Sequence, residues 1–186
     1  MTLIRFMRST CILSIILIAL IGCNQCSEPF ERIVLLSEEH KNVIPYSGDE
    51  TLVYVNNHGD TTSLDGQGRS TSIEEVGASS DKCFRGVYHL EKDKTTFESV
   101  DQEFKFILIF GTHETGVDFL IEINDNCHYA NTILWADPDL NILEINGMEY
   151  QSIYELNGLE IKTFYNKEFG ILRFIENDTI TWDLLR

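Results

Sequence analysis

Positively charged residues are scarce in this chain. Its 186 residues include 14 Lys and Arg against 30 Asp and Glu, which gives a formal net charge of −16 at pH 7. A field of this sign repels DNA, RNA and anionic lipid headgroups, so a nucleic-acid partner is excluded. The acids are spread through the chain rather than gathered in a tail, as on a solvated surface. With 43% hydrophobic residues, the chain is globular rather than disordered.

The sequence also lacks a complete catalytic or metal-binding pattern. The five histidines show no pairing at metal-ligand spacing, and His113–Val117 lacks the second histidine of a zinc-protease helix. Gly68–Ser72 lacks the second glycine of a hydrolase nucleophile elbow. We therefore predict no catalytic residue, no metal site and no cofactor. Paired carboxylates for hydrolysis stay an open alternative, because thirty acids offer many pairs.

One acidic segment partly resembles a calcium loop. Asp137–Asn141 has the alternating oxygen ligands that open such a loop. However, Ile142 stands where the glycine belongs, and Met148 stands where the closing glutamate belongs. A β-turn set by the Asp-Pro dipeptide is the favoured interpretation.

A long apolar run occurs only at the start of the chain. Arg5 and Arg8 precede the apolar stretch Cys11–Ala19, and Leu20–Cys23 follows it. This layout is a secretory signal, too short and wrongly flanked for a membrane-spanning helix. Leu20–Cys23 resembles the lipobox of bacterial lipoproteins, which implies a signal peptide over residues 1–22, cleavage between Gly22 and Cys23, and diacylation of Cys23.

The cysteines give one disulfide prediction. Cys11 leaves with the signal and Cys23 is assigned to lipid, so Cys26, Cys83 and Cys127 remain in an oxidising compartment. Three single pairings are possible. We favour a Cys83–Cys127 disulfide, because both border strand-like segments while Cys26 lies in the tether beside the anchor. No catalytic role is expected for any of them.

The segment after the anchor contains one short helix. Residues 23–30 are the lipidated cysteine and a tether, and Glu31–Leu36 is either strand or helix. Ser37–Ile44 is predicted to be helical, with Ser37 as the N-cap, two acids in the first turn and Pro45 ending it.

From Thr51 onward, the chain consists of strand-like runs separated by turn residues. No long amphipathic helix lies between them, which indicates an all-β fold, a single antiparallel domain over residues 31–186. The polar, Gly-containing stretch Thr61–Ser80 has the weakest strand pattern. It is either a recognition surface built from turns, or a poorly ordered connection or pair of exposed edge strands. The predicted strands are Leu52–Val55, Cys83–Glu91, Glu103–Phe110, Gly116–Ile123, Asn141–Ile145, Met148–Leu156, Gly170–Glu176 and Thr179–Leu185.

The sequence also predicts two hairpin turns and the inward faces of two strands. Asn146-Gly147 and Asn177-Asp178 predict hairpin turns. Glu103–Phe110 is apolar on both faces, and Gly116–Ile123 alternates cleanly, so this part of the sheet needs a second cover. The cover is either another sheet or a helix over a dry core, or else a ligand in a cavity. The domain is accordingly predicted to be a sandwich or a curved half-barrel. The predicted inward side chains are Phe104, Phe106, Leu108 and Phe110 in the first strand, and Val117, Phe119, Ile121 and Ile123 in the second.

Several motifs carry a family resemblance. They are Leu36–Lys41, Pro45–Gly48, Leu52–Tyr54, Asn57–Thr61 and Lys162–Phe174, together with the lipobox. With them the chain resembles small uncharacterised lipoproteins of Bacteroidetes. The resemblance implies a Gram-negative envelope with an outer membrane, and it brings no activity or catalytic residue.

The residues after the lipidated cysteine indicate in which membrane of the envelope the protein is anchored. Residue 24 is Asn rather than the Asp that marks inner-membrane retention, so we expect a lipid anchor in the outer membrane. Asn24–Pro29 has only one acid, Glu28, and the periplasmic and cell-surface faces both stay open.

Three function hypotheses follow. The leading one is a non-enzymatic binding or structural module of the cell envelope, attached to the membrane through its lipid and meeting an envelope protein or ligand. The second is a carrier of an apolar ligand or lipid in a half-barrel cavity, and the third is an envelope hydrolase with paired carboxylates. The inward faces of Phe104–Phe110 and Val117–Ile123 discriminate between the first two. Tyr165 and Phe169 could stack on sugars, although strand spacing favours a place in the core or on a sheet face for both.

Overall fold

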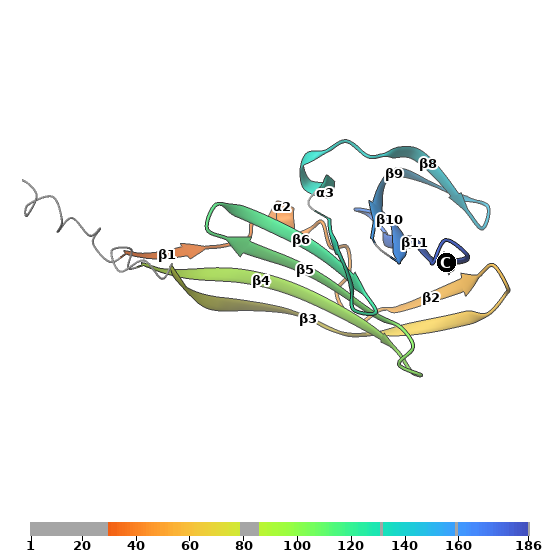
Figure 1. Ribbon diagram of the computed structural model, residues 1–186, viewed down its shortest axis with the longest axis horizontal. Helices are drawn as coiled ribbons and strands as arrows, with labels where there is room; N and C mark the ends of the chain where they lie inside the picture. Colours follow the sequence, from red (N-terminus) through yellow and green to blue (C-terminus); the bar gives the residue numbers. More distant parts are fainter. Residues whose placement is uncertain (1–29, 79–85, 131, 159, 186) are drawn as a thin grey trace, which may run out of the picture. The chain divides into compact units, whose positions relative to one another are not determined.

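The structure is a computed structural model that describes residues 30–78, 86–130, 132–158 and 160–185 (Figure 1). The predicted cleavage and lipidation positions, Gly22 and Cys23, lie outside these residues, as do Cys26 and Cys83. Cys127 is described by its backbone alone. Within the described ranges, no helix combines the length and the apolar character needed to cross a membrane.

Strands hold 67% of the residues and helices 4%, which confirms the all-β prediction. Two helices of four residues each, α2 (Glu38–Lys41) and α3 (Thr132–Trp135), accompany them. The strands are β1 (Phe30–Val34), β2 (Thr51–Asn56), β3 (Thr61–Ala78), β4 (Gly86–Ser99), β5 (Lys105–His113), β6 (Gly116–Ile123), β7 (Asn126–Tyr129), β8 (Leu140–Ile145), β9 (Met148–Asn157), β10 (Ile161–Asn166), β11 (Gly170–Glu176) and β12 (Ile180–Leu185).

The strands form one antiparallel sheet with two ends. Its order is β7-β6-β5-β4-β3-β2-β12-β11-β10-β9-β8, and β1 pairs with β4 off this path. Both predicted hairpin turns are confirmed, since Asn146, Gly147, Asn177 and Asp178 all have φ between 49° and 78°. Left-handed φ at both central residues is what a two-residue hairpin turn of type I′ requires.

The described residues divide into two compact groups. The smaller group comprises residues 30–32, 75–78 and 86–88. In it the Phe30 ring meets the Tyr88 ring edge to face, with centroids 5.2 Å apart. A Cβ at Gly86 would overlap the Phe30 ring, so this position needs a glycine for the close approach. The larger group comprises residues 33–74 and 89–185.

In the larger group, strands β10 and β11 of the same sheet cover the inner face of β5 and β6. The ring centroids of Phe106 and Phe174 lie 5.3 Å apart, which joins β5 to β11. Phe119 contacts Tyr165 at 5.6 Å and joins β6 to β10. The sheet therefore curves back on itself and fills the interior with aromatic side chains. Edge-to-face ring pairs of this kind are favourable beyond the area they bury.

The predicted strand faces are confirmed. The inward residues Phe104, Phe106, Leu108 and Phe110 are all buried, and Phe119, Ile121 and Ile123 are completely so. Val117 is partly buried against the same core. Period-two alternation was enough to assign these faces, because successive strand residues point to opposite sides of a sheet.

The first elements of the chain are partly as predicted. The undecided segment Glu31–Leu36 forms strand β1 as far as Val34. Ser37 is the N-cap of α2, and its side chain accepts a hydrogen bond from the backbone N–H of His40 at 3.2 Å. The helix ends at Lys41, before the predicted limit, because the next residues turn into the core, where Ile44 is 1% exposed.

As far as Ala78, the stretch Thr61–Ser80 is neither a surface built from turns nor a pair of exposed edge strands. This stretch is β3, an 18-residue strand that lies between β2 and β4. Its backbone is paired by neighbouring strands, which outweighs the low strand propensity of its glycines and polar residues. Gly66 is needed for a close crossing, since a Cβ there would overlap the carbonyl of Gly48.

Candidate binding site

The turn that joins β10 to β11 is held rigidly. We define it as the β10–β11 turn, Asn166–Gly170. The side-chain oxygen of Asn166 accepts hydrogen bonds from the backbone N–H groups of Glu168 at 2.7 Å and Phe169 at 3.0 Å. This is an Asx-type turn, the reason why Asn is favoured at such positions. Gly170 has φ +78°, a conformation that side chains rarely allow.

The hydroxyl of Tyr46 fastens the same turn to the rest of the protein. It donates to the carbonyl of Phe169 at 3.1 Å and accepts from the N–H of Ile171 at 2.8 Å. A Cβ at Gly170 would overlap this hydroxyl, so the glycine is required sterically as well as for its φ. Tyr46 therefore bridges the two sides of Gly170.

Three surface pockets surround the β10–β11 turn. The first, about 550 Å³, lies between Lys167, His40 and Leu134. The second, about 480 Å³, is lined by turn residues Asn166–Phe169 together with Glu149–Ser152 and Tyr154. The third, about 280 Å³, is lined by Phe169 with Tyr46 and Leu52 among others. Because all three share turn residues, the turn is the centre of the candidate binding surface.

The second pocket combines aromatic rings with polar groups. The Lys167 ammonium lies 5.3 Å from the centroid of the Tyr154 ring, a cation–π contact. Tyr150 meets Phe169 edge to face at 5.4 Å. The Tyr150 side chain is almost fully buried, and its hydroxyl has no hydrogen-bond partner among the described residues. An unpaired buried hydroxyl costs free energy, and this one belongs to a residue that lines the pocket.

A local irregularity in β9 shapes this pocket. Ser152 has φ +57°, which is unusual for a residue other than glycine. The side chain of Asn166 donates to the carbonyl of Gln151 at 2.5 Å and so joins this part of β9 to the β10–β11 turn. The pocket wall is therefore built from two rigidly connected backbone segments.

Two buried carboxylates next to the core are each paired with a cation. The guanidinium of Arg69 donates from Nε to both oxygens of Asp93, at 3.1 and 3.0 Å, and Asp93 is 1% exposed. The hydrogen bonds to Asp93 raise the pKa of Arg69 further above its ordinary value. Lys41 lies 3.0 Å from Glu91, and this hydrogen bond raises the pKa of Lys41.

The same charged side chains hold the segment that follows α2 in place through hydrogen bonds to its backbone. Arg69 also donates to the backbone carbonyls of Lys41, Ile44 and Tyr46. Glu91 accepts from the N–H of Leu36 at 2.7 Å. Both carboxylates thus have a structural task, the placement of the loop that carries Tyr46.

The other predicted positions lie apart from the pockets. Asp139, of the segment compared with a calcium loop, accepts a hydrogen bond from the N–H of Glu155 at 2.8 Å. Across the residues that the structure describes, no three His, Cys, Asp or Glu side chains form a metal-binding group. His113 ends strand β5 and does not lie on a helix. Tyr165 is completely buried, which confirms the core alternative for that ring.

Sequence reasoning missed the residues that organise the site. Tyr46, Arg69 and Asp93 were not singled out, since their partners lie 23 to 125 positions away in the chain. Phe169 was considered as a sugar-stacking residue and does line two of the pockets. No known protein family, curated protein or solved structure matches this chain.

Proposed function

We propose that this protein is a non-enzymatic binding or structural module of a bacterial cell envelope, held in the outer membrane by acyl chains on Cys23. The observation that carries the binding function is the group of three pockets around the rigid β10–β11 turn, Asn166–Gly170. Rigid scaffolds with shaped loops are where recognition usually occurs.

The filled interior favours this function over that of a carrier. A carrier of lipid would need a lined void between the two halves of the sheet. The inward side chains of β5 and β6 instead contact rings of β10 and β11 directly, as in the Phe106–Phe174 and Phe119–Tyr165 pairs. A ligand would have to displace these contacts, which a close-packed core resists.

The two buried acids next to the core are unsuited to the paired-carboxylate chemistry of a hydrolase, because each is paired with a cation. Glycoside hydrolysis needs one carboxylic acid and one carboxylate on either side of the substrate. Asp93 is paired with Arg69, and Glu91 is paired with Lys41. Both carboxylates belong to the polar cluster that holds the segment after α2 in place. Substitution of either acid would therefore destabilise the fold, whether or not the acid takes part in a reaction.

The proposed anchor fits the position of the first strand. Strand β1 begins at Phe30, seven residues after Cys23. Even a fully extended chain of this length spans only about 25 Å. The start of β1 would therefore stay close to the membrane surface, as expected for a short-tethered lipoprotein.

Native mass spectrometry of the protein purified from its own envelope tests the binding function. We expect a lipid, sugar or protein to co-purify with the wild type. The double variant Lys167→Ala/Phe169→Ala should lose this species, because Lys167 and Phe169 together line all three pockets.

A matched control is Lys105→Ala/Val100→Ala, a substitution of one exposed cation and one exposed apolar residue elsewhere. This variant should retain the co-purifying species. If the wild type reproducibly carries none, or if the Lys167→Ala/Phe169→Ala variant retains it, the proposed binding surface is wrong.

A further inference from the structure

Strand β8 presents an edge suited to strand addition. It is the last strand of the sheet, and its only paired neighbour among the described residues is β9. In Figure 1 it lies at the outside of the ribbon, beyond β9. Its six residues include neither Pro nor Lys, the residues with which natural sheets commonly protect an exposed edge. Its outer backbone groups can therefore pair with another extended chain.

On the outer face of the β8–β9 hairpin, two glutamate side chains lie opposite each other and repel. Glu144 lies directly opposite Glu149 in the antiparallel register, and both side chains are exposed. Like charges in this arrangement destabilise a strand pair. Neither carboxylate forms an ion pair with a side chain that the structure describes. A cation supplied from outside would remove this repulsion.

Apolar side chains accompany Glu144 along strand β8. Ile142 is 55% exposed on the face that carries Glu144, opposite Gln151. Leu143 and Ile145 point to the other face, where Ile145 is buried and Leu143 packs against the core. A strand added beside β8 would therefore meet Glu144 and Ile142 on the exposed face, and the apolar side chains of Leu143 and Ile145 on the other face.

We propose that β8 binds an extended segment of a partner protein in which basic side chains alternate with apolar ones. Its backbone would extend the sheet, and its basic side chains would lie on the face of Glu144, with Glu149 one strand further into the sheet. The inference rests on the proposed binding function and names a partner class for the hairpin that borders the second pocket, which Glu149 also lines.

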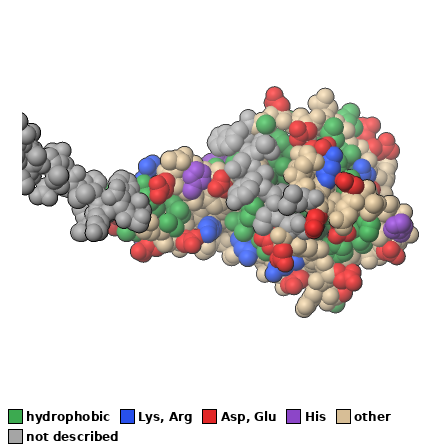
Figure 2. Space-filling view, in the orientation of Figure 1, with side chains coloured by type: hydrophobic (Ala, Val, Ile, Leu, Met, Phe, Trp, Pro, Cys, Tyr) green, Lys and Arg blue, Asp and Glu red, His purple; other side chains and the backbone are tan. Residues whose placement is uncertain are grey.

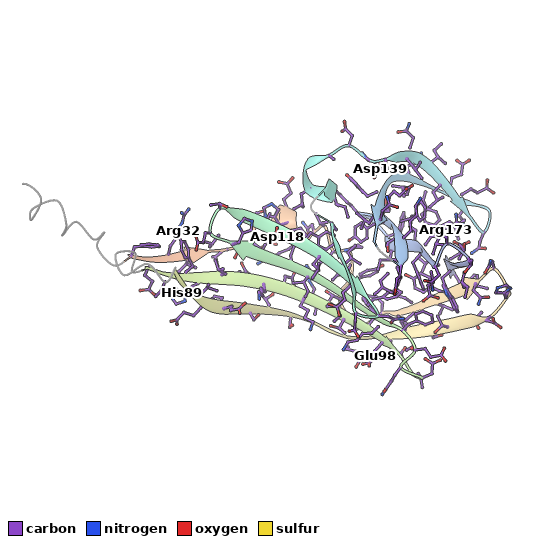
Figure 3. All side chains as sticks on the ribbon, viewed as in Figure 1. Arg32, His89, Glu98, Asp118, Asp139 and Arg173 are labelled. Atoms are coloured by element: carbon purple, nitrogen blue, oxygen red, sulfur yellow. The ribbon has the colours of Figure 1, made fainter. Side chains whose placement is uncertain are left out.

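Charge complementarity decides between this occupant and a second copy of the chain. Each molecule has a formal net charge of −16, so two copies repel each other as they approach. Figure 2 shows acidic side chains scattered over the visible face, and Asp139 lies where the chain enters β8 (Figure 3). A basic segment would be steered toward this surface, whereas a second acidic chain would be kept away.

Amide hydrogen exchange on the full-length protein tests the proposal, with a short capped peptide of alternating Lys and Val as the probe. The peptide should slow exchange at the amides of Leu140–Ile145, and its binding should weaken as salt is added. A peptide of alternating Glu and Val should cause no protection. A Lys–Val peptide with a central Pro should also fail, since Pro removes a ladder hydrogen bond.

The double variant Glu144→Lys/Glu149→Lys should weaken binding of the Lys–Val peptide by at least about tenfold. Glu103→Lys/Glu114→Lys, which reverses two exposed acids elsewhere, is the matched control and should bind almost normally. Equal losses in both double variants, or no protection of β8, would overturn the proposal. Protection of β8 that rises with protein concentration in the absence of peptide would instead identify a second copy as the occupant.

The two proposals fail separately. If the co-purifying species depends on Lys167 and Phe169 while the Lys–Val peptide leaves β8 unprotected, the binding function stands and the edge-strand inference is wrong. If no species co-purifies yet the peptide protects β8, the pocket surface is wrong and the edge is the site of interaction.

Discussion

Three tyrosine hydroxyls connect parts of this protein that are far apart in the chain. Tyr46 and Tyr54 reach the backbone of β11 and its preceding turn, and Tyr165 donates to the carbonyl of Val43 at 2.5 Å. Each bond spans more than a hundred residues, so it constrains the tertiary structure rather than a local turn. A buried hydrogen bond of this kind contributes about 1 kcal/mol net, and leaving the carbonyl unpaired costs more.

The first prediction concerns Gly170. Gly170→Ala combines a left-handed backbone, which costs about 1–2 kcal/mol for other residues, with an overlap between the new Cβ and the Tyr46 hydroxyl. Overpacking of this kind adds about 1–3 kcal/mol. Urea unfolding followed by circular dichroism should show the sum of the two costs.

Gly59→Ala is the control for that substitution. Gly59 has φ +92°, but no atom lies near the position of its Cβ, so only the backbone cost applies. Gly170→Ala should therefore lose clearly more stability than Gly59→Ala. Equal losses would show that Tyr46 does not pack against the turn as described.

The second prediction is a loss of stability at alkaline pH. Burial raises the pKa of both Tyr54 and Tyr165 well above the ordinary value, with nearby Tyr46 adding to the effect. The unfolded state loses these protons near pH 10 and the folded state only at higher pH. Their stabilising contribution is therefore complete below about pH 10 and is lost as pH rises toward the folded pKa values, by about 1.4 kcal/mol per pH unit for each tyrosine.

Urea unfolding between pH 8 and 11 measures this slope. Tyr165→Phe should be less stable than the wild type at pH 8, because it loses the bond to Val43, and its stability should fall less steeply above pH 10. An unchanged slope in the variant would show that Tyr165 titrates normally in the folded protein.

At the scale of the elements, the long strand β3 has a structural role in the middle of the sheet. Residues Thr51–Val55 of β2 pair with Thr61–Asp65, and β4 lies on the other side. Further along, Arg69 carries the contacts to Asp93 and to the segment after α2. The strand thus joins the sheet to the loop that positions the β10–β11 turn.

The third prediction follows from this placement. Deletion of Gly66–Ser72 removes Arg69 and leaves the buried Asp93 without its cation. Breaking a buried pair in this way costs about 3–5 kcal/mol, a large part of a typical folding free energy. The deletion should therefore abolish the cooperative thermal transition seen by circular dichroism. Deletion of His58, in the exposed β2–β3 connection, should leave the transition in place. A folded Gly66–Ser72 deletion would contradict the assignment of this stretch to the central sheet.

At the scale of the whole molecule, attachment to the membrane is expected to depend on one residue. The fourth prediction is that Cys23→Ser releases the protein from the membrane fraction, because the acyl chains are its proposed attachment. Cys26→Ser, three positions further on, is the control and should stay in the membrane. Fractionation and immunoblotting measure both. A Cys23→Ser protein that remains in the membrane pellet would show that another contact holds it.

The fifth prediction is the Cys83–Cys127 disulfide, which lies outside the described residues apart from the backbone of β7. Peptide mapping without reduction should find these two cysteines joined. The chain-entropy account gives about 4 kcal/mol of stabilisation for a loop of this size. Reduction should lower the unfolding midpoint of the wild type and leave a Cys83→Ala/Cys127→Ala variant unchanged. A mapped bond to Cys26 would contradict the assignment.

Features that depend on residues close together in the chain could be predicted from the sequence. Alternation in Gly116–Ile123 identified the inward face of β6, and the Asn146-Gly147 pair identified a hairpin turn. The N-cap at Ser37 was equally local. In each case the physical cause is the side-chain period of a strand, the φ that a turn requires, or an unpaired N–H at a helix start.

Features that depend on partners far apart in the chain could not be predicted from the sequence and became visible in the fold. Thr61–Ala78 is a strand because β2 and β4 lie beside it, and β10 and β7, which were not predicted, are likewise strands within the paired sheet. The pockets depend on Tyr46 meeting Gly170 across the molecule. Such contacts arise when the sheet curves around its aromatic core, and their energy comes from burial and pairing that no local pattern contains.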